Sequence, residues 1–264
     1  MKLMSWLACL TFVACAHSPL PGAALTRVSR PAFIARIVEK AGPYSTVFRD
    51  DDSYKAALKR LSPDEADRRL AEKLTHGVRD PKTGQRVIPT ITRFEIADAL
   101  RTETMAKLPR GAPWNATLSP VEVAGALESY LVDEVPANAP DYGLLKSHGA
   151  DAVVEFVIEE YGMRSEDGRA GIALKGYARL FFIDADEVYV RRFFSDEVRA
   201  ELPHLDPFAV AKNPVLFRDR MRAMVSVIAE QLAADLTPDD APTASPAKPA
   251  RDAAPTVPAE EDPL

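Results

Sequence analysis

Hydrophobic and polar positions alternate most regularly in the second half of the chain. Through the middle of Ala152–Met163 every second side chain is apolar, and Glu155 and Glu159 fall on the opposite side. A period of two with one apolar side predicts a β-strand that has one face in a core and its charged face in solvent. Two further apolar segments follow after polar turns, at Ile172–Ile183 and Val188–Phe194. Strands joined by short turns in this way predict a β-meander.

A single apolar stripe at helical spacing follows the meander. Its residues span about six helical turns and are Phe217, Met221, Met224, Val225, Ile228, Leu232 and Leu236. Such a stripe has to be buried, and the nearest apolar surface is one face of the meander. We therefore expect an α/β (α+β) fold in which an antiparallel or mixed β-meander of at least three strands is backed by this long C-terminal helix.

The first half of the chain is predicted to be mainly helical. Ser62-Pro63-Asp64-Glu65 and Ser119-Pro120-Val121-Glu122 are capping boxes with proline at the first helical position. Apolar spacing also predicts a helix over Thr92–Leu108 and one or two helical turns over Asp141–His148. Phe33–Val38 fits either a strand or the first turns of a helix. We expect one body over 31–236, with a helical part in 55–148 and the sheet and closing helix in 149–236.

Residues 1–14 have the features of a signal peptide. Lys2 is followed by an uncharged apolar run that is shorter than the roughly 20 residues a membrane-spanning helix needs. The run ends in Phe12-Val13-Ala14-Cys15, which resembles the lipobox of bacterial lipoprotein signal peptides, with phenylalanine in place of the usual leucine. The resemblance implies cleavage before Cys15, lipid chains on that residue and stable attachment to a membrane.

Two other outcomes at this end of the chain stay open. Ala14-Cys15-Ala16 also satisfies the A-x-A rule for ordinary signal-peptide cleavage, and an uncleaved or cytosolic start is the third outcome. The lipoprotein resemblance, with alanine rather than aspartate after the cysteine, implies the periplasmic face of a bacterial outer membrane. Cys9 and Cys15 both lie in this region, so no disulfide is expected within the processed chain.

Composition separates both ends of the chain from its body. Residues 15–30 combine the cysteine with proline, alanine and serine, which predicts a lipidated cysteine followed by a flexible tether. From Thr237 onward, six acidic residues face two basic ones among seven prolines, so 237–264 is predicted to be a disordered tail. The formal net charge is −6 and no basic face is visible, so we expect no nucleic-acid partner.

Sequence motifs for catalysis are absent. The chain contains no Gly-x-Ser-x-Gly, Gly-x-x-x-x-Gly-Lys or His-Glu-x-x-His motif, and Asp184–Glu187 lacks the spacing of an EF-hand loop. The adjacent Glu159 and Glu160 are expected on opposite faces of a strand. The histidines His76, His148 and His204 are isolated in sequence. We therefore expect no catalytic residues, metal or cofactor. The alternative is a secreted or periplasmic enzyme whose site assembles from residues distant in sequence.

Aromatic residues crowd the second and third predicted strands. Packing on both faces of a sheet explains them, and an exposed aromatic patch that binds a partner is the alternative. The candidate residues for such a partner surface are Tyr177, Phe181, Tyr189 and Phe193.

The order of predicted elements in 149–236 carries a second resemblance. Gly149-Ala150-Asp151 leads into an apolar strand, and Ile183-Asp184-Ala185-Asp186 ends the next, before another strand and a long helix. This order resembles the core of envelope lipoproteins related to the curli-secretion lipoprotein and the TolB amino-terminal domain, which implies a small α/β layer that binds or assembles without catalysis. We expect a lipid-anchored envelope protein whose partners are the membrane, through Cys15, and another envelope protein. The oligomeric state stays open.

Overall fold

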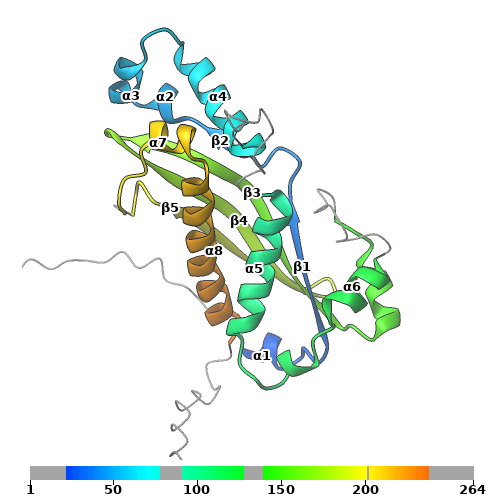
Figure 1. Cartoon of the computed structure of the whole chain (residues 1–264). Coiled ribbons are helices and arrows are strands. Elements are labelled where there is room, and N and C mark those ends of the chain that lie inside the picture. The colour runs from blue at the N-terminus through cyan, green and yellow to red at the C-terminus, as the bar shows by residue number, and fades with distance from the viewer. Residues whose placement is uncertain (1–21, 78–90, 128–138, 201, 238–264) are drawn as a thin grey trace, which may run out of the picture.

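The computed structural model describes residues 22–77, 91–127, 139–200 and 202–237. Within these ranges the centre is a mixed five-stranded sheet in the order β1-β3-β4-β5, with β2 also beside β3. β1 (Pro31–Ile37) and β2 (Tyr44–Ser45) run parallel to β3 (Ala152–Glu166), while β4 (Arg169–Phe182) and β5 (Val188–Asp196) continue antiparallel. The predicted α/β class with a three-strand meander is confirmed (Figure 1).

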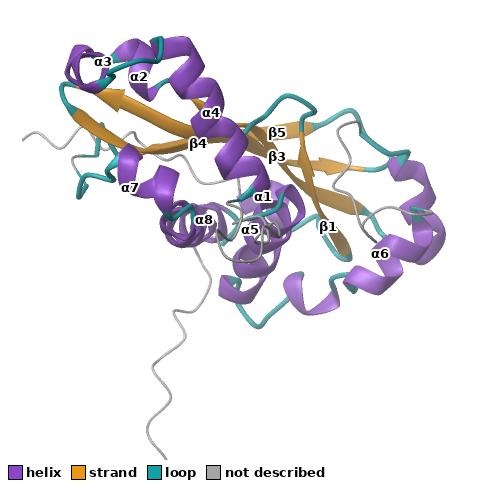
Figure 2. Ribbon diagram, turned by 45° about the horizontal axis from the view of Figure 1, so that its top comes forward, coloured by secondary structure: helices purple, strands orange, loops and turns teal. Residues whose placement is uncertain are grey.

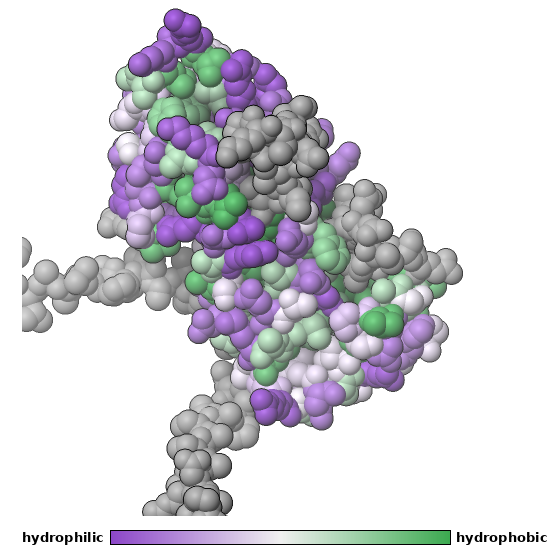
Figure 3. Space-filling view, in the orientation of Figure 1, coloured by the Kyte–Doolittle hydropathy of each residue, from purple (hydrophilic) through white to green (hydrophobic). Residues whose placement is uncertain are grey.

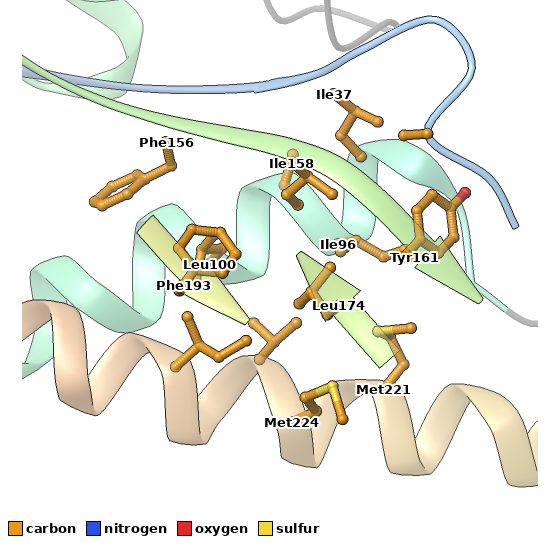
Figure 4. Close-up of a cluster of buried hydrophobic side chains, with 14 of the residues drawn as sticks. Ile37, Ile96, Leu100, Phe156, Ile158, Tyr161, Leu174, Phe193, Met221 and Met224 are labelled. Carbon is orange, nitrogen blue, oxygen red and sulfur yellow. The ribbon is translucent and has the colours of Figure 1, made fainter. Parts of the chain in front are cut away.

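Two long helices cover one face of this sheet. α5 (Arg93–Lys107) and α8 (Val215–Asp235) pack against each other across it (Figures 1 and 2). The predicted apolar stripe from Phe217 to Leu236 is at most 5% exposed and joins Phe156, Ile158 and Leu174 in the main core (Figure 4). The prediction of a long C-terminal helix behind the meander is therefore confirmed.

The shorter helices gather near the two ends of the sheet (Figure 1). At one end lie α2 (Val47–Asp50), α3 (Asp52–Ala57), α4 (Pro63–His76) and α7 (Pro207–Lys212). At the other end lie α1 (Gly22–Leu25), α6 (Pro120–Ala126) and the 3-10 helices η1 (Trp114–Ala116) and η2 (Tyr142–His148). Ser62 and Ser119 are the predicted N-caps, and each hydroxyl accepts a hydrogen bond from the backbone N–H three residues on.

Phe33–Val38, whose pattern fitted a strand or a helix, forms most of β1. All residues of β1 are buried, and the strand pairs in parallel with the start of β3 from Pro31–Ala152 to Ile37–Ile158. A strand that is buried on both faces has no apolar–polar alternation, which is why periodicity did not separate the two possibilities.

The tether predicted for residues 15–30 is too long at its carboxyl end. Gly22–Leu25 is helical, and Leu25 and Val28 are 1% and 5% exposed in the main core. The Asp151 carboxylate then holds the chain by accepting hydrogen bonds from the backbone N–H groups of Ser29 and Arg30, at 2.7 and 2.8 Å. The folded body thus includes residues 22–30. The predicted signal peptide, Cys15 and the tail beyond Thr237 lie outside the described residues.

Candidate functional site

The sheet face turned away from α5 and α8 is covered most fully at its β1 end. There α6 and η2 form a second, smaller core with Ala32, Ile34 and Val153. Toward the other edge, the register of β4 and β5 brings two rows of side chains together on this face. We call these residues the outer strip: Tyr177, Arg179 and Phe181 from β4, and Val188, Val190, Arg192 and Phe194 from β5.

The outer strip exposes large apolar side chains next to one another. Val188, Val190 and Phe194 are 50%, 56% and 50% exposed. Arg192 lies over the Tyr177 ring, with 5.9 Å between its guanidinium carbon and the ring centroid. On the α5–α8 side, by contrast, hydrophobic residues appear in small groups among polar ones (Figure 3). Arg192 separates Val190 from Phe194 along this face, and Arg199 lies over the Phe194 ring at 5.5 Å. Exposed apolar side chains with Tyr, Phe and Arg among them are typical of surfaces that bind another protein.

The four residues predicted as a partner surface lie on both faces of the sheet. Tyr177 and Phe181 belong to the outer strip, where each is partly buried. Tyr189 and Phe193 point to the opposite face, and Phe193 is 7% exposed among the core residues between the strands and α8 (Figure 4). The four side chains therefore do not form one surface, and the exposed apolar residues of β5 were missed.

A buried ionic cluster supports the strip from its β3 side. Glu155 is fully buried, and its carboxylate accepts a hydrogen bond from Arg36 Nε at 2.6 Å. The same carboxylate accepts hydrogen bonds from Arg179 Nε and from the Tyr142 hydroxyl. Burial, together with the hydrogen bond to Glu155, raises the pKa of the Tyr142 hydroxyl. The prediction that Glu155 faces solvent is wrong, because these partners enclose and neutralise it.

Aromatic rings fix the orientation of the Arg179 side chain. Its guanidinium carbon lies 4.9 Å from the Phe181 ring centroid and 5.8 Å from that of Tyr142. The Phe181 and Tyr142 rings meet edge to face, with 5.0 Å between their centroids. Cation–π and edge-to-face contacts of this kind hold side chains in one arrangement. The end of the outer strip nearest η2 is therefore preorganised.

Two hollows open on the surface, one beside β5 and one at the end of the sheet that carries α4 and α7. One of about 610 Å³ is bordered by β5 and α8, with the lining residues Glu159, Lys175, Gly176, Arg192, Phe193, Phe194 and Gln231. The other, of about 690 Å³, lies between α4 and α7 and is lined by Phe48, Leu70 and Phe208 together with polar residues such as Lys73 and His76. Among the described residues, each lining contains a single carboxylate, Glu159 or Glu72, so these residues do not bring together the paired acids of general acid–base catalysis.

The acidic residues considered from the sequence for catalysis or metal binding form ion pairs with different basic residues. Asp184–Glu187 forms the predicted polar turn between β4 and β5, and Asp184 accepts a hydrogen bond from Lys146 Nζ at 2.8 Å. Glu159 pairs with Arg192 at 3.5 Å and Glu160 with Lys175 at 3.2 Å. The prediction that the two glutamates lie on opposite faces is wrong, because the register shift between Ile158 and Glu160 interrupts the alternation of β3 and both carboxylates reach partners on the face that carries the outer strip. These contacts are local ion pairs and do not converge on a common centre.

The histidines stay apart as well. His204 Nδ1 accepts a hydrogen bond from Ala170 N at 3.1 Å, while His76 and His148 end α4 and η2. Among the described residues, no three His, Cys, Asp or Glu side chains come together in a way that could hold a metal ion. In the same ranges no helix is long and apolar enough to cross a membrane.

Comparisons with known proteins do not assign the chain to a family. No family model matches the chain, and no curated protein does. Among solved structures, the chain is similar to the hypothetical protein CT253 from Chlamydia trachomatis, with 10% sequence identity over 78% of this chain and 98% of that one, at a TM-score of 0.29. A score this low assigns neither a fold family nor a function.

Proposed function

We propose that this chain is a lipid-anchored bacterial envelope protein that acts without catalysis, as a binding or assembly component, and that a protein partner docks on the outer strip. The observation that supports docking is the group of half-exposed apolar residues Val188, Val190 and Phe194 beside Tyr177 and Phe181 on one sheet face. Covering such residues releases water from apolar surface, which favours association.

The anchor part of the proposal rests on the sequence Phe12-Val13-Ala14-Cys15. A Cys15→Ser variant removes the only thiol that follows the predicted cleavage point. The parent chain should fractionate with membranes and incorporate labelled fatty acid, and the variant should do neither. A variant that stays in the membrane fraction with unchanged electrophoretic mobility would show that Cys15 is not the anchor.

The docking part is tested by site-specific photo-cross-linking in intact cells. A photoreactive residue in place of Tyr177, in the middle of the outer strip, should give one discrete adduct with a second protein. The control is the same residue in place of Val121, which is 81% exposed on α6, away from the strip. Adding Val188→Glu should reduce the Tyr177 adduct about tenfold, equivalent to about 1.4 kcal/mol of binding. Equal adducts from both positions, or no effect of Val188→Glu, would contradict the proposal.

A further inference from the structure

The two edge strands of the sheet differ in how far they are covered by other parts of the chain. β1, at one edge, is buried along its whole length. β5, at the other edge, pairs with β4 on one side and with no other strand of the described ranges. The backbone N–H of Glu197 donates to the carbonyl of Ile172 at 3.0 Å, and the antiparallel register runs from there through β5 without a shift. Since hydrogen-bonded pairs alternate in an antiparallel ladder, the N–H and C=O groups of Val188, Val190, Arg192 and Phe194 point outward from the sheet.

These outward groups have no hydrogen-bond partner among the described residues. The edge strand, VYVRRFFSD, contains neither proline nor lysine, and its pairing with β4 has no bulge. Its two arginines each contact an acidic residue of the same chain, Arg191 with Asp235 and Arg192 with Glu159. A long apolar edge of this kind is a template for another strand. Pairing with β5 of a second copy uses the same surface on both chains, which is the contact that closes a symmetric dimer.

One antiparallel register suits the side chains of two β5 strands. With the two-fold axis at Arg191, Val188 lies opposite Phe194 of the second copy, and Tyr189 lies opposite Phe193 of the second copy. Val190 then lies opposite Arg192 of the second copy, whose aliphatic stem covers it. Every exposed apolar side chain of the strand obtains a cross-strand neighbour, and aromatic or aromatic–aliphatic pairs of this type stabilise a sheet.

The neighbouring registers are less favourable. An axis at Arg192 sets that residue opposite itself, and its side chain is 72% exposed with only a 3.5 Å contact to Glu159. An axis at Val190 leaves Phe194 without a strand opposite, and an axis at Phe193 does the same to Val188. The axis at Arg191 also sets two arginines opposite each other, but each Nε is held by its own Asp235 at 3.0 Å, so each arginine has its own counter-charge.

We propose that the outer edge of β5 pairs with β5 of a second copy of this chain, antiparallel and with the two-fold axis at Arg191, joining the two sheets into one. This inference goes beyond the proposed function because its hydrogen bonds form along the strand edge. Val188, Val190 and Phe194 take part in both contacts, whereas Tyr177 and Phe181 take part in docking alone. A monomeric chain would therefore reject the pairing and leave the Tyr177 cross-linking result unaffected.

Disulfide trapping tests both the pairing and its register. The full chain with Cys9→Ser and Cys15→Ser provides a background without native thiols. Val188→Cys and Phe194→Cys chains, mixed and mildly oxidised, should form a disulfide-linked dimer of about twice the 28.9 kDa chain mass. Each variant alone should give several-fold less dimer, because each new thiol faces the other position. A mixture of Val188→Cys with Val121→Cys is the control and should give no dimer above background.

A charge placed on the edge gives an independent measurement. Val190→Lys adds a positive charge opposite Arg192 of the second copy without touching the hydrogen bonds to β4. We expect the dimer dissociation constant, measured by sedimentation equilibrium, to rise about tenfold or more, while Val121→Lys leaves it unchanged. A chain that is monomeric before any substitution, a dimer indifferent to Val190→Lys, or equal trapping in the control mixture would each overturn the inference.

Discussion

Arg36 Nε lies 2.6 Å from a carboxylate oxygen of Glu155, and this contact ties β1 to β3 inside the sheet. The Glu155 side chain is 0% exposed and the Arg36 side chain 9%. Arg179 from β4 and Tyr142 from η2 reach the same carboxylate. One acidic side chain thus links the three strands β1, β3 and β4 to η2, which covers part of the sheet face that carries the outer strip. A buried charge is tolerated only when it is paired and hydrogen-bonded, so each member depends on the others.

We expect Glu155→Gln to destabilise the fold by about 3–5 kcal/mol, because it leaves Arg36 and Arg179 without their shared counter-charge in a buried site. The control is Glu160→Gln on the same strand, whose partner Lys175 lies 3.2 Å away with both side chains roughly half exposed. Exposed pairs contribute at most about 1 kcal/mol. Urea unfolding of the Cys15→Ser chain measures both free energies. Similar losses for the two variants would mean that Glu155 is not buried as described.

Gly176 allows β3 and β4 to approach each other. A Cβ atom at this position would lie 2.2 Å from the Val157 carbonyl oxygen and 2.6 Å from Cζ of Phe193. We expect Gly176→Ala to cost about 1–3 kcal/mol, because a backbone atom cannot move aside as a flexible side chain can. Gly125→Ala in α6 is the control, since no atom lies within 4 Å of its added methyl group. That substitution should raise the free energy of unfolding by up to about 1 kcal/mol. Thermal unfolding of both variants provides the comparison.

Periodicity predicted the strands and helices in which polar residues recur at a regular interval among apolar ones. β3, β4, β5 and α8 show a regular apolar side, and the N-caps Ser62 and Ser119 mark helix starts by local chemistry alone. β1 could not be assigned in this way, because both of its faces are buried. Residues 22–30 are held by contacts with Asp151, more than a hundred residues away in sequence, which no local pattern contains.

The candidate site was harder to predict for a related reason. Glu155 looks like a solvated strand residue until Arg36 is known to lie beside it, and that depends on the parallel pairing of β1 with β3. The composition of the outer strip depends on the register of β5 against β4 and on which sheet face α8 covers. Alternation within the second strand places Tyr177, Arg179 and Phe181 on one face, but it does not tell which residues of β5 lie beside them.

The N-terminal cap of α5 should make a measurable contribution to the free energy of unfolding. The Thr92 hydroxyl accepts a hydrogen bond from Glu95 N at 3.0 Å, and the Glu95 carboxylate accepts one from Thr92 N at 2.7 Å. We expect Thr92→Ala to lower the free energy of unfolding by about 1 kcal/mol. Thr102→Ala on the same helix is the control, because its hydroxyl donates hydrogen bonds back to the carbonyls of Asp98 at 2.7 Å and Ala99 at 3.3 Å and caps no helix end. Alanine has the higher helix propensity there, so that variant should be neutral or slightly stabilised. Equal losses would show that Thr92 does not cap α5.

Tyr161 should make the stability of the protein fall at alkaline pH. The residue is 1% exposed in the main core, and burial raises the pKa of its hydroxyl to about 12. Because the folded state holds this proton more tightly than the unfolded chain, the contribution is complete below about pH 10 and is lost as the pH rises toward about 12. Two pH units correspond to at most about 2.7 kcal/mol.

We expect Tyr161→Phe to flatten the decline of unfolding free energy between about pH 10 and 12, as measured by urea unfolding at a series of pH values. The decline should be reduced and not abolished, since the pKa values of Tyr44 and Tyr54 are also raised to about 12. Tyr177→Phe, which keeps Tyr161, is the control and should retain the steeper decline. If Tyr161→Phe and Tyr177→Phe gave the same alkaline profile, Tyr161 would not be titrating from a buried position, and the placement of its side chain in the main core would have to be revised.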